Sequence, residues 1–424
     1  MIWFMGHRIV ILGGGTGGTL TANRLHRRYG DRAEIVVVDR DDRHVYQPGL
    51  LFVPFGLADP DGIVRSRGKQ LHDGIEFRLA EVDRVELDAN VVHLTDGGVL
   101  PYDVLVIASG AALLPGETEG LTGPGWGERV FTFYTLEGAT ALRDALRRFD
   151  GGRLVVNVVD MPIKCPVAPL EFCFLADWYL RKRGVREATE LIYATPLDGA
   201  FTKPVAAEHL GGMLEHKGIA LEAEFATGHI DGENGRLVSW DDREVSFDLL
   251  VTIPLHGGAE FVARSAGLGD ELGFVSANPH TLQSTRAENV FAIGDATNLP
   301  TSKAGSATHF EGETLVANIG RFLAGEDLVG SYDGHVNCFI ESGFHKALLI
   351  DFNYEVEPAP GRYPGAHLGP LPLLRESRLN HLAKLAFQPL YWHVLLPGRD
   401  LPGIGAQMST AAQQLTATRQ GDTE

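Results

Sequence analysis

Short, continuous apolar runs separated by helix-like stretches recur along the chain. Residues 8–12 (RIVIL) and 34–39 (EIVVVD) form two of these runs, and a helical pattern lies between them. Similar runs occur at 102–111, 152–160 and 288–297. Such runs are typical of strands buried on both faces of a parallel sheet. The alternation predicts an α/β fold with two Rossmann-like domains of the type that binds FAD or NAD(P).

A glycine motif follows the first run. Gly13, Gly15 and Gly18 fit the spacing G-x-G-x-x-G, with Thr16 inside it, and a helix is expected to follow. The glycines allow a tight turn and a close approach of the backbone to a pyrophosphate at the helix N-terminus. The second run ends in Asp39, an acid suited to the adenosine ribose hydroxyls. This combination predicts a dinucleotide site, and a glycine-rich turn without a nucleotide is the alternative.

Two later runs end in residues suited to a flavin. Ser109 and Gly110 close the run at 102–111, and Gly294 and Asp295 close the run at 288–297. A carboxylate at the C-terminal end of a strand faces the ligand crevice of an open α/β sheet. Asp295 is therefore expected to hold the ribitol hydroxyls, with a role as a turn or helix-cap acid as the alternative. Lys303, just before an expected helix, either adds positive charge at the flavin or is a solvated surface lysine.

The strand at 152–160 does not lead into a second glycine loop. It runs into Met161-Pro162-Ile163-Lys164-Cys165-Pro166, and no glycine occurs from position 161 to 183. Proline has no N–H group and blocks a close approach of the backbone to phosphate. An amphipathic helix with a basic end is expected over about 170–183. The sequence therefore predicts the scaffold of a nucleotide-binding domain in which a cysteine stands where the glycine-rich phosphate-binding loop would be.

Three cysteines are candidates for redox chemistry. Cys165 is expected beside a helix N-terminus, which lowers a thiol pKa, and Lys164 would help. Glu171, six residues further on, is a candidate for proton transfer. A small buried residue is the alternative for Cys165, and Cys173 is expected to be core. Spacing alone does not connect Cys338 to Cys165.

Composition and charge exclude several classes of function. The formal net charge of −18 argues against bulk nucleic-acid binding, which needs a basic face. Three cysteines are too few for a disulfide-stapled secreted scaffold, and no metal site is expected from the scattered histidines. We expect neither a signal peptide nor a transmembrane helix. The expected location is the cytoplasmic side of a membrane, as a peripheral protein, with a homo-oligomer possible.

The region from about residue 371 mixes apolar, aromatic and basic residues and is broken by prolines. This composition is typical of a segment that lies in a membrane interface, and dimer contact or core packing is the alternative. The final stretch, residues 408–424, is polar and predicted to be disordered. The cations and aromatic residues of the region are Arg375, Arg378, Lys384, Arg399, Phe387, Tyr391 and Trp392.

Taken together, these motifs resemble the sulfide:quinone oxidoreductases, which are flavoproteins with two dinucleotide-binding domains. The most specific matches are Cys165 with Glu171, and Cys338 followed by Phe339. The resemblance implies that Cys165 and Cys338 form a redox pair on one face of the flavin. It also implies a quinone among aromatic side chains, for which the candidates are Phe339, Phe344, Tyr391 and Trp392.

The chain departs from the family at Tyr134, which stands where many members have a third cysteine. A covalently attached flavin is therefore not expected, and FAD should bind non-covalently. Many members also have a histidine after the third strand of the middle domain, and residues 193–204 (YATPLDGAFTKP) contain none. This leaves room for a persulfide or a carrier-bound sulfur as substrate.

The predicted function is FAD-dependent oxidation of sulfide or a related persulfide, with electrons passed to a membrane quinone. The alternatives are an enzyme like the type II NADH:quinone oxidoreductases, which the absent second glycine loop disfavours, and a non-catalytic flavoprotein that binds a sulfur carrier. The expected domains are an FAD-binding domain (1–112 and 280–325), a second Rossmann-like domain (113–279) and a C-terminal quinone- and membrane-associating region (326–424).

Overall fold

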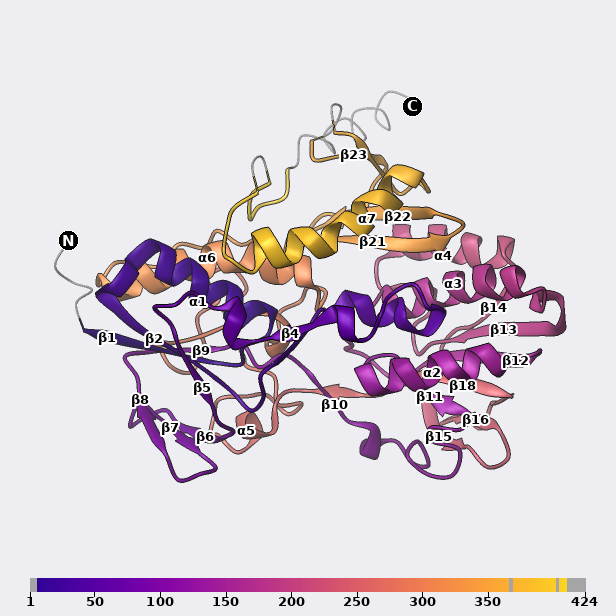
Figure 1. Ribbon diagram of the computed structural model, residues 1–424, viewed down its shortest axis with the longest axis horizontal. Coiled ribbons are helices and arrows are strands. Elements are labelled where there is room, and N and C mark those ends of the chain that lie inside the picture. Colours follow the sequence, from indigo (N-terminus) through magenta and orange to yellow (C-terminus); the bar gives the residue numbers. More distant parts are fainter. Residues whose placement is uncertain (1–5, 366–368, 402–403, 410–424) are drawn as a thin grey trace.

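The computed structural model describes residues 6–365, 369–401 and 404–409. Two five-stranded parallel sheets lie side by side along the long axis of the molecule (Figure 1). The predicted α/β fold with two Rossmann-like halves is confirmed. The predicted domain boundaries stay a prediction, and the polar residues 410–424 lie outside the described residues.

The first sheet has the strand order β20-β9-β1-β2-β5. Its central strand, β1, is buried from Ile9 to Leu12, because parallel strands are covered on both faces. Helices α1 (Thr16–Tyr29) and α6 (Gly305–Leu323) pack against each other on one face (Figure 1). The strands are β1 (His7–Leu12), β2 (Ala33–Asp39), β5 (Glu76–Leu79), β9 (Val104–Ile107) and β20 (Val290–Ala292).

The second sheet has the order β11-β18-β12-β13-β14. Three helices accompany it: α2 (Leu136–Arg148), α3 (Ala168–Arg183) and α4 (Pro204–His216). Its strands are β11 (Val130–Phe131), β12 (Gly152–Val158), β13 (Thr189–Ala194), β14 (Ile219–Glu222) and β18 (Leu249–Ile253).

Helix α3 differs from the amphipathic helix that the sequence predicts. Every residue from Ala168 to Asp177 is buried, so the first ten residues have no solvent-facing side. The reason is that α3 packs on β12 and β13 and is also covered by strand β21 (Val336–Gly343) from the C-terminal region. The helix has Pro169 in its first turn and ends at Gly184, which adopts a left-handed conformation.

Smaller elements complete and connect the two halves. The antiparallel sheets are β6 (Val82–Glu86), β7 (Val91–Leu94) and β8 (Val99–Pro101), and β15 (Thr227–Asp231), β16 (Arg236–Ser239) and β17 (Glu244–Ser246). The paired strands β10 (Ala112–Leu113) and β19 (His256–Gly257) lie where the chain crosses between the halves, and β3 (Arg43–Val45) pairs with β4 (Val64–Ser66). Helix α5 is Glu260–Ala263.

The C-terminal region lies across the top of both halves in Figure 1. Strand β21 pairs with β22 (Lys346–Phe352), and helix α7 (Arg378–Leu390) packs on this hairpin. Strands β23 (Gly361–Tyr363) and β24 (Leu371–Leu373) form a second small pair, and a turn of π-helix (Tyr391–Leu395) follows α7. Within the described residues, none of the helices combines the length and apolar character that spanning a membrane requires.

Candidate active site

A cavity of about 810 Å³ is lined by residues from both halves and from the C-terminal region. This volume lies within the range of about 300–1,000 Å³ that is usual for ligand and cofactor sites. The carboxyl ends of β1, β9 and β20 open into it, because these three strands are neighbours in the first sheet. The cavity is therefore at the edge of the sheet where α/β proteins bind their ligands.

The glycine motif forms the turn between β1 and α1. Gly13 has φ +102°, and a Cβ atom there would lie 2.5 Å from the carbonyl oxygen of Ala108. A Cβ atom on Gly18 would lie 1.8 Å from the Gly13 carbonyl oxygen, so only glycine fits. Gly15 faces open space and caps α1 without a side chain, and the first turn of α1 has no acid. The helix N-terminus is therefore shaped and charged for an anion.

Asp39 binds the glycine turn itself. Its Oδ2 atom accepts a hydrogen bond of 2.7 Å from the Gly14 N–H and lies 3.1 Å from Nη1 of Arg67. Arg67 is almost buried, lines the cavity and also pairs with Asp41. Arg67 lies 28 residues after Asp39 and belongs to no motif, so the sequence reasoning missed it. The acid at the end of β2 is held in place by the turn and by this arginine.

Strands β9 and β20 end beside the glycine turn, because they follow β1 in the order of the first sheet. Ser109 lines the cavity, and its buried Oγ atom has no hydrogen-bond partner among the described residues. Asp295 follows β20, and burial raises the pKa of its carboxyl group while Lys303 and Lys164 oppose the rise. An unsatisfied hydroxyl, a buried acid and a glycine cradle in one cavity fit a bound dinucleotide.

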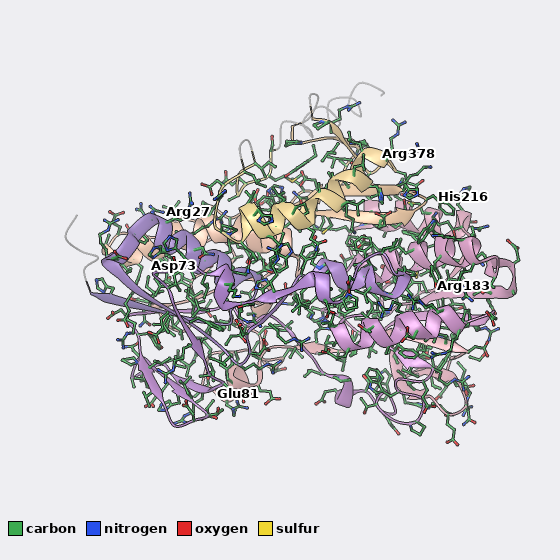
Figure 2. All side chains as sticks on the ribbon, viewed as in Figure 1. Arg27, Asp73, Glu81, Arg183, His216 and Arg378 are labelled. Carbon is green, nitrogen blue, oxygen red and sulfur yellow. The ribbon has the colours of Figure 1, made fainter. Side chains whose placement is uncertain are left out.

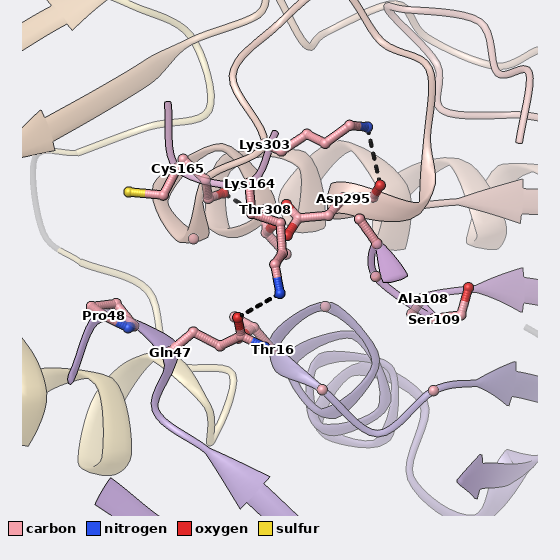
Figure 3. Close-up of a pocket in the computed structure, with 18 of the residues that line it drawn as sticks. Thr16, Gln47, Pro48, Ala108, Ser109, Lys164, Cys165, Asp295, Lys303 and Thr308 are labelled. Atoms are coloured by element: carbon pink, nitrogen blue, oxygen red, sulfur yellow. Dashed lines mark hydrogen bonds between the residues drawn. The ribbon is translucent and has the colours of Figure 1, made fainter. Parts of the chain in front are cut away.

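Two lysines, Lys303 and Lys164, line the cavity and act on the charge of Asp295 (Figure 3). The Lys303 ammonium group donates to the carbonyl oxygen of Asp295 at 3.0 Å and lies 3.8 Å from the ring centre of Phe274. It is thus neither a solvated surface lysine nor free of partners. The Lys164 side chain extends toward Gln47 and donates to its Oε1 atom at 3.2 Å.

Cys165 and Cys338 line the same cavity although they are far apart in the sequence. Cys165 is half-buried just before α3, whereas Cys338 is buried in β21, and both are free thiols. Burial, followed by the neighbouring Cys165, raises the pKa of Cys338 well above its usual value. Cys173 is buried inside α3 and is not among the residues that line the cavity, so its interpretation as core is confirmed.

The pKa of Cys165 moves in the opposite direction to the one expected. Burial raises it to about 12, Glu171 adds to the rise, and Lys384 opposes it. Lys164 points its ammonium group toward Gln47, so the helix start and Lys164 do not produce the lowered thiol pKa that the sequence suggested. Desolvation in the cavity wall and a nearby carboxylate both disfavour the charged thiolate, so the thiol stays neutral.

Glu171 is buried in the first turn of α3 and links it to the C-terminal region. It accepts a hydrogen bond of 2.6 Å from the Glu341 N–H and makes a close ion pair with the Lys384 ammonium group. Lys384 also donates to the carbonyl oxygen of Phe339 at 3.0 Å. Burial raises the pKa of Glu171, and Lys384 opposes the rise. Lys384 was expected among the membrane-facing cations, but it points inward with 10% of its side chain exposed.

The four aromatic quinone candidates are not gathered at one place. Phe339 and Tyr391 line the cavity, whereas Phe344 is 44% exposed at the turn between β21 and β22. Trp392 is buried beside His44 and is not among the cavity-lining residues.

Tyr391 lies at the glycine-motif end of the cavity. Its hydroxyl group lies 2.8 Å from Oγ1 of Thr16 and 2.6 Å from Nε2 of His44. The C-terminal region thus contacts the N-terminus of α1 directly. Sequence reasoning missed His44, because no motif surrounds it.

Comparisons with known proteins agree with this geometry. Residues 7–159 match the family model described as pyridine nucleotide-disulphide oxidoreductase. The chain is 27% identical to a mitochondrial sulfide:quinone oxidoreductase of Dictyostelium discoideum, over 92% of this chain and 86% of that protein. It is 26% identical to the mitochondrial sulfide:quinone oxidoreductase of Mus musculus, over 92% and 87% of the two chains. The crystal structure of the sulfide:quinone oxidoreductase from Aquifex aeolicus has the same fold, with a TM-score of 0.79, 20% identity, and coverage of 93% and 92%.

The fold and these matches define the protein as an oxidoreductase, and they imply a flavin cofactor. More particularly, the chain is similar to sulfide:quinone oxidoreductases over nearly its whole length, and the resemblance predicted from the sequence is confirmed.

Proposed function

We propose that the protein oxidises sulfide, or a related persulfide, with non-covalently bound FAD, and that the electrons pass on to a membrane quinone. One observation carries the proposal: Cys165, Cys338 and Glu171 line the same cavity as the glycine motif and Asp295. This cavity combines a dinucleotide cradle with two thiols and a buried acid. The relatives named as sulfide:quinone oxidoreductases support the choice of sulfide as donor and quinone as acceptor.

The described residues fit FAD along the length of the cavity. The N-terminus of α1 would bind the pyrophosphate, Asp39 the adenosine ribose, and Asp295 the ribitol. When bound, FAD supplies a two-electron acceptor for the sulfur chemistry. Tyr134 lines the cavity and offers no thiol for covalent attachment. The residues assigned to the cofactor are Gly13, Gly15, Thr16, Gly18, Asp39, Ser109, Gly110, Gly294, Asp295 and Lys303.

The two cysteines would carry the sulfur. Attack of hydrosulfide on a Cys165–Cys338 disulfide forms one S–S bond and breaks another, leaving a persulfide on one cysteine and a thiolate on the other. Lys384 would stabilise that thiolate, because its charge lowers the pKa of both thiols. Glu171 would hold or release the proton of the incoming sulfur compound, since burial raises the pKa of its carboxyl group and so favours the protonated form, while Lys384 opposes this rise.

The rival assignment, an enzyme like the type II NADH:quinone oxidoreductases, finds less support in the turn after β12. Cys165 and two prolines, Pro162 and Pro166, occupy this turn in place of glycines. Since proline offers no N–H group, the turn is poorly suited to a second pyrophosphate.

An anaerobic titration tests the proposed function. Sulfide should bleach the flavin absorbance of the purified holoenzyme, and a short-chain ubiquinone should then restore it, while NADH should leave the oxidised spectrum unchanged. Bleaching by NADH alone would favour the rival enzyme. An unchanged flavin spectrum with both donors would favour a non-catalytic flavoprotein.

We further propose that α7 attaches the protein to the cytoplasmic side of the membrane as a peripheral protein. Leu379, Leu382 and Leu385 are 45%, 58% and 49% exposed, whereas Asn380 and Lys384 on the other side of the helix point inward. Arg378 at the start of α7 is exposed on the same side of the molecule (Figure 2). Half-exposed leucines beside a cation suit a helix that lies in a lipid interface.

Replacing these three leucines by serine should weaken binding to anionic lipid vesicles about a hundredfold, since burying the exposed half of each leucine contributes about 1 kcal/mol. Co-sedimentation with the vesicles measures the effect. A matched control replaces Leu79, Leu221 and Leu272 by serine. These leucines are also exposed, but they lie outside α7. Equal vesicle binding by both triple variants would refute the role of α7.

A further inference from the structure

The phenol of Tyr134 contacts the backbone of the residue that carries the proposed redox thiol. Its hydroxyl group donates to the carbonyl oxygen of Lys164 at 2.9 Å and to that of Cys165 at 3.3 Å. Tyr134 comes from the segment between β11 and α2, so the contact joins two turns at the edge of the second sheet. Tyr134 and Cys165 also line the cavity.

The backbone of Cys165 has an unfavourable conformation that its neighbours must maintain. Its φ is +45°, in the left-handed region that a residue with a side chain rarely adopts. Such a conformation costs about 1–3 kcal/mol and persists only where several contacts impose it. Besides the phenol, two contacts do so: the Cys165 N–H donates to the Lys303 carbonyl at 2.7 Å, and the Cys165 carbonyl accepts from the Ala168 N–H at 2.8 Å.

The Tyr134 ring is itself fixed. It lies 4.9 Å from the ring of Phe133 and stands perpendicular to the ring of His256 at 5.6 Å. The next residue, Thr135, caps α2 by accepting a hydrogen bond from the Gly138 N–H at 3.0 Å. Burial raises the pKa of Tyr134 well above its usual value, so the hydroxyl keeps its proton and remains a donor at neutral pH.

We propose that Tyr134 is a positioning residue that holds Cys165 in the left-handed conformation and so directs its sulfur into the cavity. This inference rests on the proposed role of Cys165. The phenol reaches across the turn to the carbonyls of the two successive peptide groups that flank the Cα atom of Cys165. Removing the donor takes this hydrogen bond from the Lys164 carbonyl and leaves the Cys165 carbonyl with the Ala168 N–H as its donor, which frees the turn to relax toward an ordinary φ.

The test compares Tyr134→Phe with the wild-type holoenzyme. Loss of the hydroxyl should lower the maximal rate of flavin reduction by sulfide by roughly ten- to a hundredfold, because displacing a reacting group by about 1 Å can cost a hundredfold. The flavin content should stay the same, since the cofactor cradle is not touched. Peptide mass spectrometry measures the alkylation of Cys165 in the reduced holoenzyme. Relative to Cys338, this alkylation should become roughly tenfold faster, because losing a hydrogen bond of about 1.4 kcal/mol corresponds to a factor of ten.

Two further variants separate positioning from a general loss of packing. Incorporation of meta-fluorotyrosine at position 134 keeps the donor and should restore both the rate and the slow alkylation. Tyr354→Phe is the matched control, because the Tyr354 hydroxyl also donates to a backbone carbonyl, that of Pro279 at 3.0 Å, and the residue is not among those that line the cavity. This control should behave as the wild type does.

The outcomes distinguish this inference from the proposed function. Wild-type alkylation and reduction rates in Tyr134→Phe would overturn the positioning role, as would failure of meta-fluorotyrosine to restore them. Wild-type reduction by sulfide in both Cys165→Ser and Cys338→Ser would instead overturn the proposed function, whatever Tyr134→Phe does. The alkylation readout needs no sulfide chemistry and therefore decides the positioning question in either case.

Discussion

Cys165→Ser and Cys338→Ser should each lower the rate of sulfide-dependent flavin reduction by roughly a hundredfold or more, which corresponds to about 2.7 kcal/mol of activation free energy. Either substitution removes one half of the disulfide that hydrosulfide attacks, and serine cannot replace it in thiol–disulfide exchange. Neither residue is part of the glycine cradle, so the flavin content of both variants should equal that of the wild type.

Rapid mixing of each oxidised variant with sulfide under anaerobic conditions measures this rate. Cys173→Ala is the matched control, because Cys173 is fully buried in α3 and is not among the cavity-lining residues. The control should reduce its flavin at the wild-type rate. If both single variants of the proposed redox pair keep that rate, the two cysteines do not carry the sulfur.

The dinucleotide part of the site was predictable because strand patterns and the residues that end the strands determine it. A Cβ atom on Gly18 would meet the Gly13 carbonyl oxygen within the same motif, and a Cβ atom on Gly13 would meet the Ala108 carbonyl oxygen just after the neighbouring strand β9. The runs that end in Ser109 and Asp295 become neighbouring parallel strands, so their C-terminal residues meet at one edge of the sheet. Each of these features follows from a strand pattern and the residue that terminates it.

The thiol end was less predictable because its contacts join remote segments. The sequence pattern predicts an amphipathic helix, but the first ten residues of α3 are all buried, since β21 covers the side that would otherwise face solvent. Cys165, just before this helix, is half-buried beside Glu171, and desolvation raises its thiol pKa. The dipole of the local helix would lower that pKa, but desolvation by the remote segments acts in the opposite direction and is the larger effect here.

The inward orientation of Lys384 is a second feature that depends on contacts between remote segments. In the sequence it is one of several cations in an apolar tail, and composition assigns all of them to the same lipid-facing role. In the structure the helical period places Lys384 on the inner side of α7, while Leu382 and Leu385 face outward. Its ammonium group forms an ion pair with Glu171, an acid 213 residues away in the sequence. No local signal distinguishes this lysine from its neighbours.

Lys384→Met should move the pH dependence of flavin reduction by sulfide to higher pH. The charge of Lys384 lowers the pKa values of Glu171, Cys165 and Cys338, so its removal raises all three. A cysteine with a higher pKa is a poorer leaving thiolate, and at neutral pH the rate should fall roughly tenfold if the profile moves by about one pH unit. Rapid-mixing rates measured across the pH range test this result.

The stability of the same variant should respond to pH with a definite sign. The folded-state pKa of the Glu171 carboxyl group is raised above its unfolded value, and without Lys384 it rises further. The folded protein then favours the protonated acid, so the free energy of unfolding of Lys384→Met relative to the wild type should fall as the pH increases through that raised pKa. Arg378→Met, which removes an exposed cation from the same helix, is the control and should change neither profile. A pH–rate profile of Lys384→Met that superimposes on the wild type would show that this ammonium group does not act on the thiols.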